Sequence, residues 1–426
     1  MNKKFYLLGL CVAASATIAN AQQLPNVGFE QWKDACGTTY TLGVFGGWSS
    51  STRPGIEPMN WNGSSVYQNA IITEVRKELV KKVEQGYSEL SVSMENGKVG
   101  ALGIESNAPG YITFGTPWIS TTTDVKKCDG GTYDGISFDK KPDAIKGYFR
   151  RIDTNDEQSH IIVYLWNGTF SSKIGLSDNP TQEQQNVDRA ILGKSNAGEI
   201  TGDGKLVASC DLEFKATSKW ESQIVELSYV ENAGEPTMMN VIISAGNYWD
   251  RNGLIEGTTL EADDVDFVYY STLKDLKVNG ETVSLEDGEY EYAMSGSALP
   301  AVEKVVATTK SQFAEAAVTV DAENAQVRIV VTNQGGKDVD GEISHTYVLQ
   351  YEKIPAGVEG VNGEAVAVYG VAGAAAIDGY SGAIEVYAAD GRLVKSVMVD
   401  GNAEIALDGG LYIVRAGGEA YKVFVK

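Results

Sequence analysis

The feature of this sequence that most limits its fold is a series of short runs in which apolar and polar residues alternate. The runs "SHIIVYLWNG", "ESQIVELSYV", "MMNVIISAG" and "DVDFVYYSTL" are separated by Gly, Asn and Asp residues that favour turns. A period of two residues places alternate side chains on opposite faces of a β-strand. Many short strands separated by turns are typical of antiparallel sandwiches and jelly rolls. The sequence therefore predicts an all-β protein.

Two stretches also show helical spacing of their apolar residues. In "YQNAIITEVRKELVKKVEQGY" (residues 67–87) Gly86 would end a helix, yet the many β-branched Ile and Val residues also suit strands. We keep both interpretations of this stretch. The stretch "TQEQQNVDRAILGKS" (residues 181–195), which follows Asn179-Pro180, is a second and shorter helical candidate.

The N-terminus indicates export. Lys3 and Lys4 precede an apolar run from Phe5 to Ile18, and Ala19-Asn20-Ala21 is a small-residue cleavage pattern. This arrangement is typical of a secretory signal peptide over residues 1–21, and the run is shorter than the roughly 20 apolar residues that span a bilayer. We therefore expect an exported protein that is extracellular or lies at the outer-membrane surface.

The chain is strongly acidic. Its formal net charge is −22, and loss of residues 1–21 removes two lysines and no acid, which makes the charge −24. Such a balance repels nucleic acid, so we expect no nucleic-acid partner. Three cysteines remain after cleavage, Cys36, Cys128 and Cys210, and they lack metal-binding spacing. An odd number of widely spaced cysteines indicates structural thiols rather than a disulfide scaffold.

Composition divides the rest of the chain into three predicted domains. The first covers residues 22–275, because composition first changes near Leu276. Residues 276–355 hold about six or seven short strands, the size of an Ig-like β-sandwich. Residues 356–426, after a Pro- and Gly-containing linker, are rich in Gly and Ala. There we expect a small β-sandwich with one hairpin joined by Asp390-Gly391 and another in "GLYIVRAGGEAYKVFVK".

The run "GTTLEADDVDFVYYSTLK" (residues 257–274) raises an electrostatic question. Alternation places Asp263 on the same face as Val265 and Phe267, which are expected to point into a core. A carboxylate in an apolar core is costly unless it is paired, hydrogen-bonded or bound to a cation. Two answers stay open: Asp263 accepts hydrogen bonds from the main chain of a turn, or it binds a cation.

Three stretches together resemble one domain family. "LPNVGFEQWKD", "DGISFDKKPDAIKGYFRRI" and "GTTLEADDVDFVYYSTLKDLKVNG" are similar, in this order, to the putative carbohydrate metabolism domain family of secreted and surface proteins of Gram-negative gut anaerobes. The resemblance extends over residues 24–276 in scattered blocks. It implies an N-terminal jelly-roll β-sandwich akin to carbohydrate-binding modules, with an Ig-like partner domain, and it implies no known reaction.

The same resemblance implies a structural calcium ion. In carbohydrate-binding jelly rolls of this kind, an N-terminal "GFE" and a C-terminal "DDV" meet and hold calcium, which takes about six to eight oxygen ligands. The matching segments here are Gly28-Phe29-Glu30 and Asp263-Asp264-Val265. The implied acidic ligands are Glu30, Asp263 and Asp264.

The C-terminus resembles a second known module. The stretches "EVYAADGRLVKSV" and "GGLYIVRAGGEAYKVFVK" are similar to the C-terminal sorting domain of type IX secretion substrates. The resemblance covers about sixty residues. It implies recognition by secretion machinery at the outer membrane and, often, removal of this domain.

Aromatic residues beside polar ones are candidate sugar-binding positions, because the C–H groups of a pyranose ring pack against aromatic faces. The stretch "GNYWDRNG" places two aromatics, an acid and an arginine in an expected loop, and alternation gives "HIIVYLW" a face with three aromatic rings. Packing in a core is the alternative for each aromatic, and it is the one we expect for Trp32 and Trp48. Trp61 and Trp118 are further candidates. The expected ligand-binding residues are Tyr248, Trp249, Asp250, Arg251, Trp166, Tyr164 and His160.

Three functions stay open. The first is a non-catalytic glycan-binding protein that assists carbohydrate capture, and the second is a structural or adhesive surface protein. The third is a jelly-roll glycoside hydrolase or lyase, which needs two carboxylates about 5 to 10 Å apart near an aromatic. The sequence lacks GxSxG, HExxH, Walker and zinc-type motifs, and a serine triad would depend on His160. We expect no catalytic residues and favour glycan binding.

Overall fold

The computed structural model describes residues 23–35, 38–42, 48–70, 73–101, 104–121, 124–175, 182–352 and 366–426. In these residues the chain is almost entirely β-structure, which confirms the all-β prediction. The exceptions are the α-helix α1 (Asp188–Ile191) and the 3-10 turns η1 (Val125–Lys127), η2 (Arg251–Gly253) and η3 (Val302–Lys304). The predicted signal peptide, Cys36 and the linker after residue 355 lie outside the described residues. Within the described part of the chain, no helix is long and apolar enough to cross a membrane.

The chain forms two compact units. The first contains Met1–Gly288, Val305–Ala317 and Ile329–Thr346, and the second contains Glu289–Lys304, Val318–Arg328 and Tyr347–Lys426. The three domain boundaries expected from composition stay a prediction.

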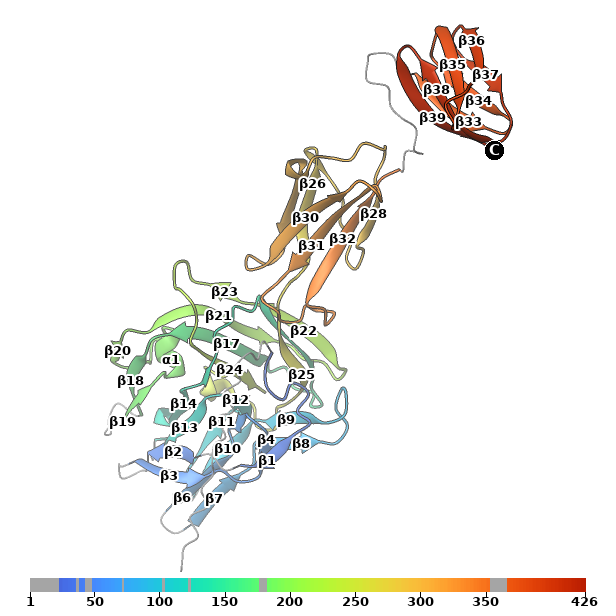
Figure 1. Ribbon diagram of the computed structural model, residues 1–426. Coiled ribbons are helices and arrows are strands. Elements are labelled where there is room, and N and C mark those ends of the chain that lie inside the picture. Colours follow the sequence, from blue (N-terminus) through green and yellow to red (C-terminus); the bar gives the residue numbers. More distant parts are fainter. Residues whose placement is uncertain are drawn as a thin grey trace, which may run out of the picture. The chain divides into compact units, whose positions relative to one another are not determined.

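Two large sheets dominate the first unit (Figure 1). The seven-stranded sheet has the order β23-β21-β17-β24-β12-β5, with β15 also paired to β24. The five-stranded sheet has the order β22-β16-β25-β9-β8. The strands of the larger sheet are β5 (Asn62–Gly63), β12 (Tyr111–Thr113), β15 (Ile136–Ser137), β17 (Ser159–Asn167), β21 (Lys205–Phe214), β23 (Ser228–Tyr229) and β24 (Met238–Ser244). Those of the smaller sheet are β8 (Val80–Val83), β9 (Ser91–Glu95), β16 (Ala144–Arg150), β22 (Glu221–Glu226) and β25 (Thr259–Val268).

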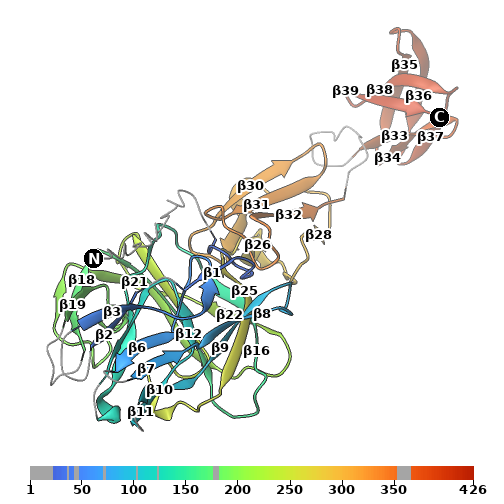
Figure 2. The same cartoon turned by 90° about the horizontal axis from the view of Figure 1, so that it is seen from below.

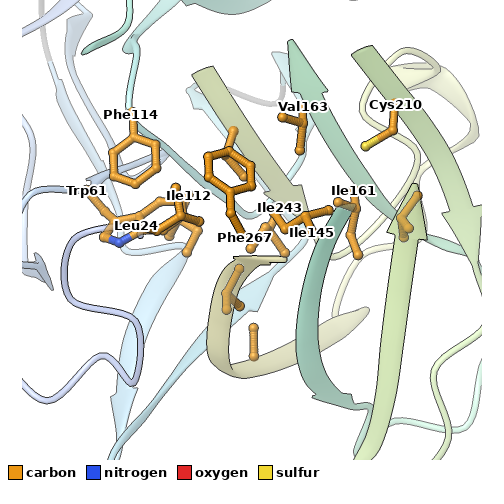
Figure 3. Packing of buried hydrophobic residues seen from close by; sticks show 14 of the residues in the cluster. Leu24, Trp61, Ile112, Phe114, Ile145, Ile161, Val163, Cys210, Ile243 and Phe267 are labelled. Carbon is orange, nitrogen blue, oxygen red and sulfur yellow. The ribbon is translucent and has the colours of Figure 1, made fainter. Parts of the chain in front are cut away.

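The two sheets share one hydrophobic core. Alternate residues of β17, Ile161, Val163 and Leu165, pack in it with Phe149 and Phe267 of the five-stranded sheet. Figure 3 shows the side chains of Ile161, Val163 and Ile243 from the larger sheet in one cluster with Ile145 and Phe267 from the smaller sheet. This two-layer packing is the predicted β-sandwich.

The opposite face of the seven-stranded sheet is also covered. There Ile162, Tyr164 and Trp166 of β17 pack with Tyr111 and Tyr248 in a second cluster. Because β17 is buried on both faces, it carries a nearly continuous apolar run. The smaller sheets of the unit, β14-β13-β2-β3 and β19-β18-β20, consist of β2 (Thr38–Leu42), β3 (Trp48–Thr52), β13 (Thr116–Ser120), β14 (Asp129–Tyr133), β18 (Phe170–Ile174), β19 (Gln182–Gln185) and β20 (Ile200–Gly202).

The start of the described chain lies beside β25. The Val265 N–H donates to the Val27 carbonyl at 3.0 Å, and the Leu24 N–H donates to the Asp266 carboxylate at 2.9 Å. Phe29 is fully buried in the same core as Val265. The segments Gly28-Phe29-Glu30 and Asp263-Asp264-Val265 thus meet, as the resemblance implies.

The predicted side-chain alternation along β25 is wrong at its centre. Lys146 of β16 faces Asp266, and Tyr148 faces Asp263, so β25 holds one extra residue between these pairs. This β-bulge shifts the phase, so Ala262 and Val265 both reach the core while Asp263 does not share their face. Asp263 instead accepts hydrogen bonds from the N–H groups of Tyr87 and Ser88.

The 67–87 stretch forms strands rather than a helix. Its residues belong to the hairpin β6 (Val66–Ala70) and β7 (Thr73–Lys77) and to β8. Figure 2 shows this hairpin near a second one, made of β10 (Gly97–Ala101) and β11 (Ile104–Ala108). The β-branched residues therefore outweigh the helical spacing. In the second helical candidate, only the four residues of α1 are helical, and β19 lies before them.

The first unit also has a two-stranded sheet of β1 (Trp32–Asp34) and β4 (Ile56–Pro58), and a sheet of order β27-β26-β29 made of β26 (Leu273–Val278), β27 (Glu281–Thr282) and β29 (Val305–Thr309). Residues 291–350 of the same chain also contain β30 (Glu315–Asp321), β31 (Gln326–Thr332) and β32 (Ser344–Gln350). Within them, β28 (Glu291–Ala293) pairs in parallel with residues 348–350. Buried and exposed residues alternate along β31 and β32, as expected when one face of a strand packs on a core.

The C-terminal part of the second unit is a small two-sheet structure. Its sheets β33-β34-β37 and β36-β35-β38-β39 share a core that includes Ile377, Val386, Val414 and Val423. The two predicted hairpins, β35–β36 and β38–β39, are confirmed. The strands are β33 (Ala367–Val371), β34 (Ala374–Asp378), β35 (Gly382–Ala388), β36 (Leu393–Val399), β37 (Ala403–Ala406), β38 (Gly410–Ala416) and β39 (Glu419–Val425).

Asp143, just before β16, makes the stability of the first unit depend on pH. Its carboxylate accepts a hydrogen bond from the Tyr270 N–H at 2.8 Å, and burial raises the pKa of Asp143 to about 6. Because this pKa exceeds that of an unfolded chain, the folded protein binds the proton more tightly between about pH 4 and 6. Ionised Asp143 therefore costs stability above pH 6.

We expect the free energy of unfolding of the wild type, relative to Asp143→Asn, to rise by on the order of 1 kcal/mol as the pH falls from 7 to 5. Urea denaturation of both proteins at pH 7, 6 and 5 measures this difference. Exposed Asp287→Asn serves as the control and should follow the wild type. Parallel curves for wild type and Asp143→Asn would contradict the prediction.

Candidate functional site

A cavity of about 230 Å³ lies in the first unit. Strands β11, β13 and β14, helix α1 and the loop around η2 contribute its lining. Tyr111 and Tyr248, which also belong to the cluster on the outer face of the seven-stranded sheet, form part of the wall. Other residues that line the cavity include Trp118, Ser120, Asp129, Arg189, Trp249 and Arg251.

Buried polar contacts fix the loop that carries Trp249. The Tyr248 hydroxyl donates to the Asp188 carboxylate at 2.7 Å, and the Tyr248 N–H donates to Nδ1 of His160 at 3.3 Å. The ring of Tyr248 meets that of Tyr111 edge to face at 5.1 Å. Burial, together with the charge of Asp188, raises the pKa of Tyr248, so this hydroxyl stays a donor. Tyr248 therefore anchors the loop beneath the cavity.

Trp249 is held in one orientation by Asp211 and Lys194. Its indole N–H lies 3.1 Å from both carboxylate oxygens of Asp211, and the Lys194 ammonium lies 4.6 Å from its ring centroid. Lys194 and His160 also bind Asp211, at 2.6 and 2.5 Å. Although burial alone would raise it, hydrogen bonds from His160, Lys194 and Trp249 lower the pKa of Asp211. A half-buried tryptophan thus lines the cavity in a fixed orientation.

The rest of the loop is a capped turn. The side-chain oxygen of Asn247 accepts from the N–H groups of Trp249 and Asp250 at 2.9 and 3.0 Å. The Asp250 carboxylate accepts from the Gly253 N–H at 3.1 Å and so caps η2. These local bonds place Arg251 and Asn252 at the cavity.

A charged group forms another part of the lining. Both terminal N–H groups of Arg189, on α1, donate hydrogen bonds to the carboxylate of Asp129, each at 2.7 Å. The Arg189 guanidinium lies 5.4 Å from the Trp118 ring centroid. Nη1 of Arg251 approaches the same carboxylate only to 3.5 Å. Burial would lower the pKa of Arg189, but its hydrogen bonds to Asp129 raise it. In contrast, burial lowers the pKa of Arg251, and the positive charge of the nearby Arg189 lowers this pKa further.

The structure brings four of the seven expected ligand-binding residues together at this cavity, namely Tyr248, Trp249, Asp250 and Arg251. The other three, His160, Tyr164 and Trp166, are buried on β17 and do not line it. The Trp166 indole donates to Asn186 at 3.1 Å, and the Tyr164 hydroxyl accepts from Asn240 at 2.7 Å. They share one face as expected, but that face is covered, so they support the cavity from below.

Sequence reasoning missed Ser120, Asp129 and Arg189, and it named Trp118 only as one aromatic among several. These residues meet because β13 pairs with β14, which places Ser120 opposite Asp129, and because α1 carries Arg189 to the same carboxylate. No short-range spacing encodes such a contact. The adjacent Gly130-Gly131 is the one local signal, since a Cβ on Gly131 would lie 2.9 Å from Asp188.

The two segments expected to hold calcium lie side by side, although their three carboxylates do not form one group among the described residues. A Cβ on Gly28 would lie 3.2 Å from a carboxylate oxygen of Asp264, and burial, with the negative charge of Glu30, raises the pKa of Asp264. Asp263, however, accepts from the N–H groups of Tyr87 and Ser88 at 2.8 and 3.0 Å. Of the two answers left open by the sequence, the turn is the one seen for Asp263.

A calcium ion at this position would therefore have Glu30 and Asp264 as its remaining candidate carboxylate ligands. Among the residues that the structure describes, no group of three His, Cys, Asp or Glu side chains is placed to hold a metal ion. The Leu90 N–H already donates to Glu30 at 3.0 Å. The fit is thus limited to two carboxylates, of which Asp264 is the more available.

A Ser-His-Asp arrangement exists elsewhere in the first unit. The Ser271 hydroxyl lies 2.8 Å from Nδ1 of His345, whose Nε2 lies 2.8 Å from Asp340. The sequence-based expectation that such a group would need His160 is wrong. Ser271 is fully buried and also bonds Asp338 at 3.2 Å, so its hydroxyl does not reach a substrate. We interpret this group as structural.

No family model and no curated protein matches the chain, so the family resemblance stays a prediction. Among solved structures, it is similar to a putative glycoside hydrolase of Bacteroides thetaiotaomicron, with 13% identity, TM-score 0.30, and coverage of 56% of this chain and 73% of that one. A second, from Bacteroides vulgatus, has 14% identity, TM-score 0.31, and coverage of 56% and 97%. A family 11 carbohydrate-binding module of Clostridium thermocellum, in complex with a β-1,3-1,4-mixed-linked tetrasaccharide, has 11% identity, TM-score 0.22, and coverage of 55% and 96%. At these scores the likenesses carry no argument about the chemistry of this chain.

Calcium binding is testable by chelation. The calcium ion that the resemblance implies would make EDTA lower the melting temperature of the first unit by several degrees, because an ion bound only to the folded state stabilises it. Asp264→Asn should abolish the effect of EDTA, whereas Asp263→Asn should leave most of it, since Asp263 is already bonded to the turn. Differential scanning fluorimetry with and without added calcium measures both. Identical melting curves in EDTA and calcium would refute the site.

Proposed function

We propose that the cavity binds a carbohydrate and that the protein captures glycans without cleaving them. The observation that supports this most is Trp249, an aromatic ring fixed by Asp211 and Lys194 at the wall of a cavity that also holds charged and amide side chains. The C–H groups of a pyranose ring pack on such a ring while its hydroxyls bond polar neighbours.

The size of the cavity favours a small part of a glycan. Its volume of about 230 Å³ lies below the roughly 300–1,000 Å³ usual for drug-sized ligands. One sugar ring, such as a chain end or a branch, suits this volume better than a long segment. Ser106, Asn107 and Asn252 at the lining provide neutral hydrogen-bonding groups for its hydroxyls.

The cavity supports binding better than hydrolysis. A glycosidase needs one carboxyl group that gives a proton and another that stays free to act as nucleophile or base. Both oxygens of Asp129 are taken by Arg189, and Asp250 caps the η2 turn. Asp188, whose pKa is raised by burial, is fully buried beneath the lining. The hydrolase therefore ranks below glycan binding.

The adhesive alternative predicts buried aromatics and no groove. Trp61, Trp118 and Trp166 are indeed buried, but Trp118 and Trp249 both line the cavity. A spacer domain has no need of an aromatic held in place by an ion-paired carboxylate. The fixed position of Trp249 at a cavity favours a ligand.

We expect Trp249→Ala to weaken glycan binding by roughly 10- to 100-fold, because it removes the ring that a sugar would pack against. A glycan array with the full chain identifies a ligand, and isothermal titration calorimetry then compares the variants. Trp220→Ala is the matched control, because Trp220 precedes β22 of the other sheet and does not line the cavity.

The control should bind as the wild type does. Equal binding by wild type and Trp249→Ala, with loss in Trp220→Ala, would move the site to the five-stranded sheet. Absence of any sugar ligand on a broad array would favour the adhesive alternative.

Glycan capture requires export, which we propose occurs through the signal peptide and the C-terminal sorting-type domain. The expected mature protein begins at Gln22, and the form on the cell surface lacks residues after about Gly357. Mass spectrometry of protein released from the surface of the producing cells measures both ends. A surface protein that still ends at Lys426 would contradict removal of the C-terminal domain.

A further inference from the structure

The two arginines at the cavity are satisfied to different degrees. Asp129 is the carboxylate that both arginines approach, and Arg189 occupies it with two hydrogen bonds of 2.7 Å. Among the described residues, the contact of Arg251 with this carboxylate is longer, at 3.5 Å, the outer limit of a hydrogen bond. The other acid at the lining, Asp250, is committed to the cap of η2.

Donor groups in the same place lack acceptors. Among the described residues, Nε of Arg251 is buried and has no hydrogen-bond partner, and the same is true of the hydroxyl of Ser120. Ser120 is fully buried and lies directly opposite Asp129 in the β13–β14 pair, so the two side chains share one face. Buried donors without partners are rare and costly, which points to an acceptor supplied by a ligand.

We propose that the sugar bound in this cavity carries a carboxylate, as uronic acids do, and that Arg251 pairs with it. This rests on the proposed function of the cavity. A guanidinium presents two parallel N–H groups to a carboxylate, and Nε with one Nη of Arg251 forms such a pair. Ser120 supplies a further donor, while the sugar ring packs against Trp249. Burial lowers the pKa of Arg251, and a bound carboxylate would offset that effect.

The test compares one sugar with and without its charge. Isothermal titration calorimetry on the full chain uses galacturonic acid, its methyl ester, galactose and galactose 6-sulfate, and the same series based on glucose. We expect at least one uronate to bind about tenfold or more tightly than its own methyl ester, as charge-assisted hydrogen bonds predict. Arg251→Gln should abolish the preference, and Arg251→Lys should retain only part of it.

Stability provides a second readout. Arg251→Gln removes a side chain whose buried Nε has no partner among the described residues and should melt at or above the wild-type temperature, whereas Arg189→Gln, which strips Asp129 of its partner, should melt below it. Exposed Arg392→Gln, in the second unit, is the matched control and should change neither binding nor melting. A marked loss of stability in Arg251→Gln would overturn the proposal, because it would show that the protein itself satisfies this side chain.

The remaining outcomes separate this inference from the proposed function. Equal binding of uronate and methyl ester, both lost in Trp249→Ala, would keep the sugar site and overturn the acidic ligand. Tighter binding of the sulfated sugar than of either uronate would overturn the carboxylate in favour of a sulfate. No binding of any sugar to the wild type would overturn both.

Discussion

The burial of β17 on both of its faces is the constraint on which the rest of the first unit depends. One face, with Ile161, Val163 and Leu165, closes the sandwich against the five-stranded sheet. The other face carries Tyr164 and Trp166 and would leave a large apolar patch if it met water. A covering layer is therefore required. The cavity lies between elements of that layer, β13, β14 and α1, and the η2 loop.

That covered face is not purely apolar, which makes its geometry specific. The carboxylate of Asp188, fully buried, accepts from the Tyr248 hydroxyl and from the N–H groups of Thr132 and Arg189. The bonds from Tyr248 and Thr132 tie the η2 loop and β14 to α1, the helix that begins at Asp188, while the bond from Arg189 lies within that helix. A half-satisfied buried carboxylate would be costly, so all three elements are held in register. The position of Trp249 and Arg189 at the cavity follows from this network.

Sequence patterns predicted the strands better than their surroundings. The alternation of β17 was correct, but alternation cannot tell which face is exposed when neither is, and so Tyr164 and Trp166 were expected at a ligand. The bulge in β25 inserts one residue near Asp263 and is invisible to a period of two. The η2 loop was found because its aromatics and charges are adjacent in sequence. Asp129 and Arg189 were missed because only the folded sheet brings them within 2.7 Å.

The acidity of the whole chain is compatible with an anion-binding position at the cavity, because the two act over different distances. A net charge of −22 sets the field far from the surface, where it keeps the protein soluble. At physiological ionic strength charges more than about 8 Å apart are largely screened. Inside the cavity the nearest groups decide, and there Arg189 pairs with Asp129 while Nε of Arg251 has no partner among the described residues. An acidic protein can therefore hold an anion-binding position, provided that its nearest acids are already committed to other donors.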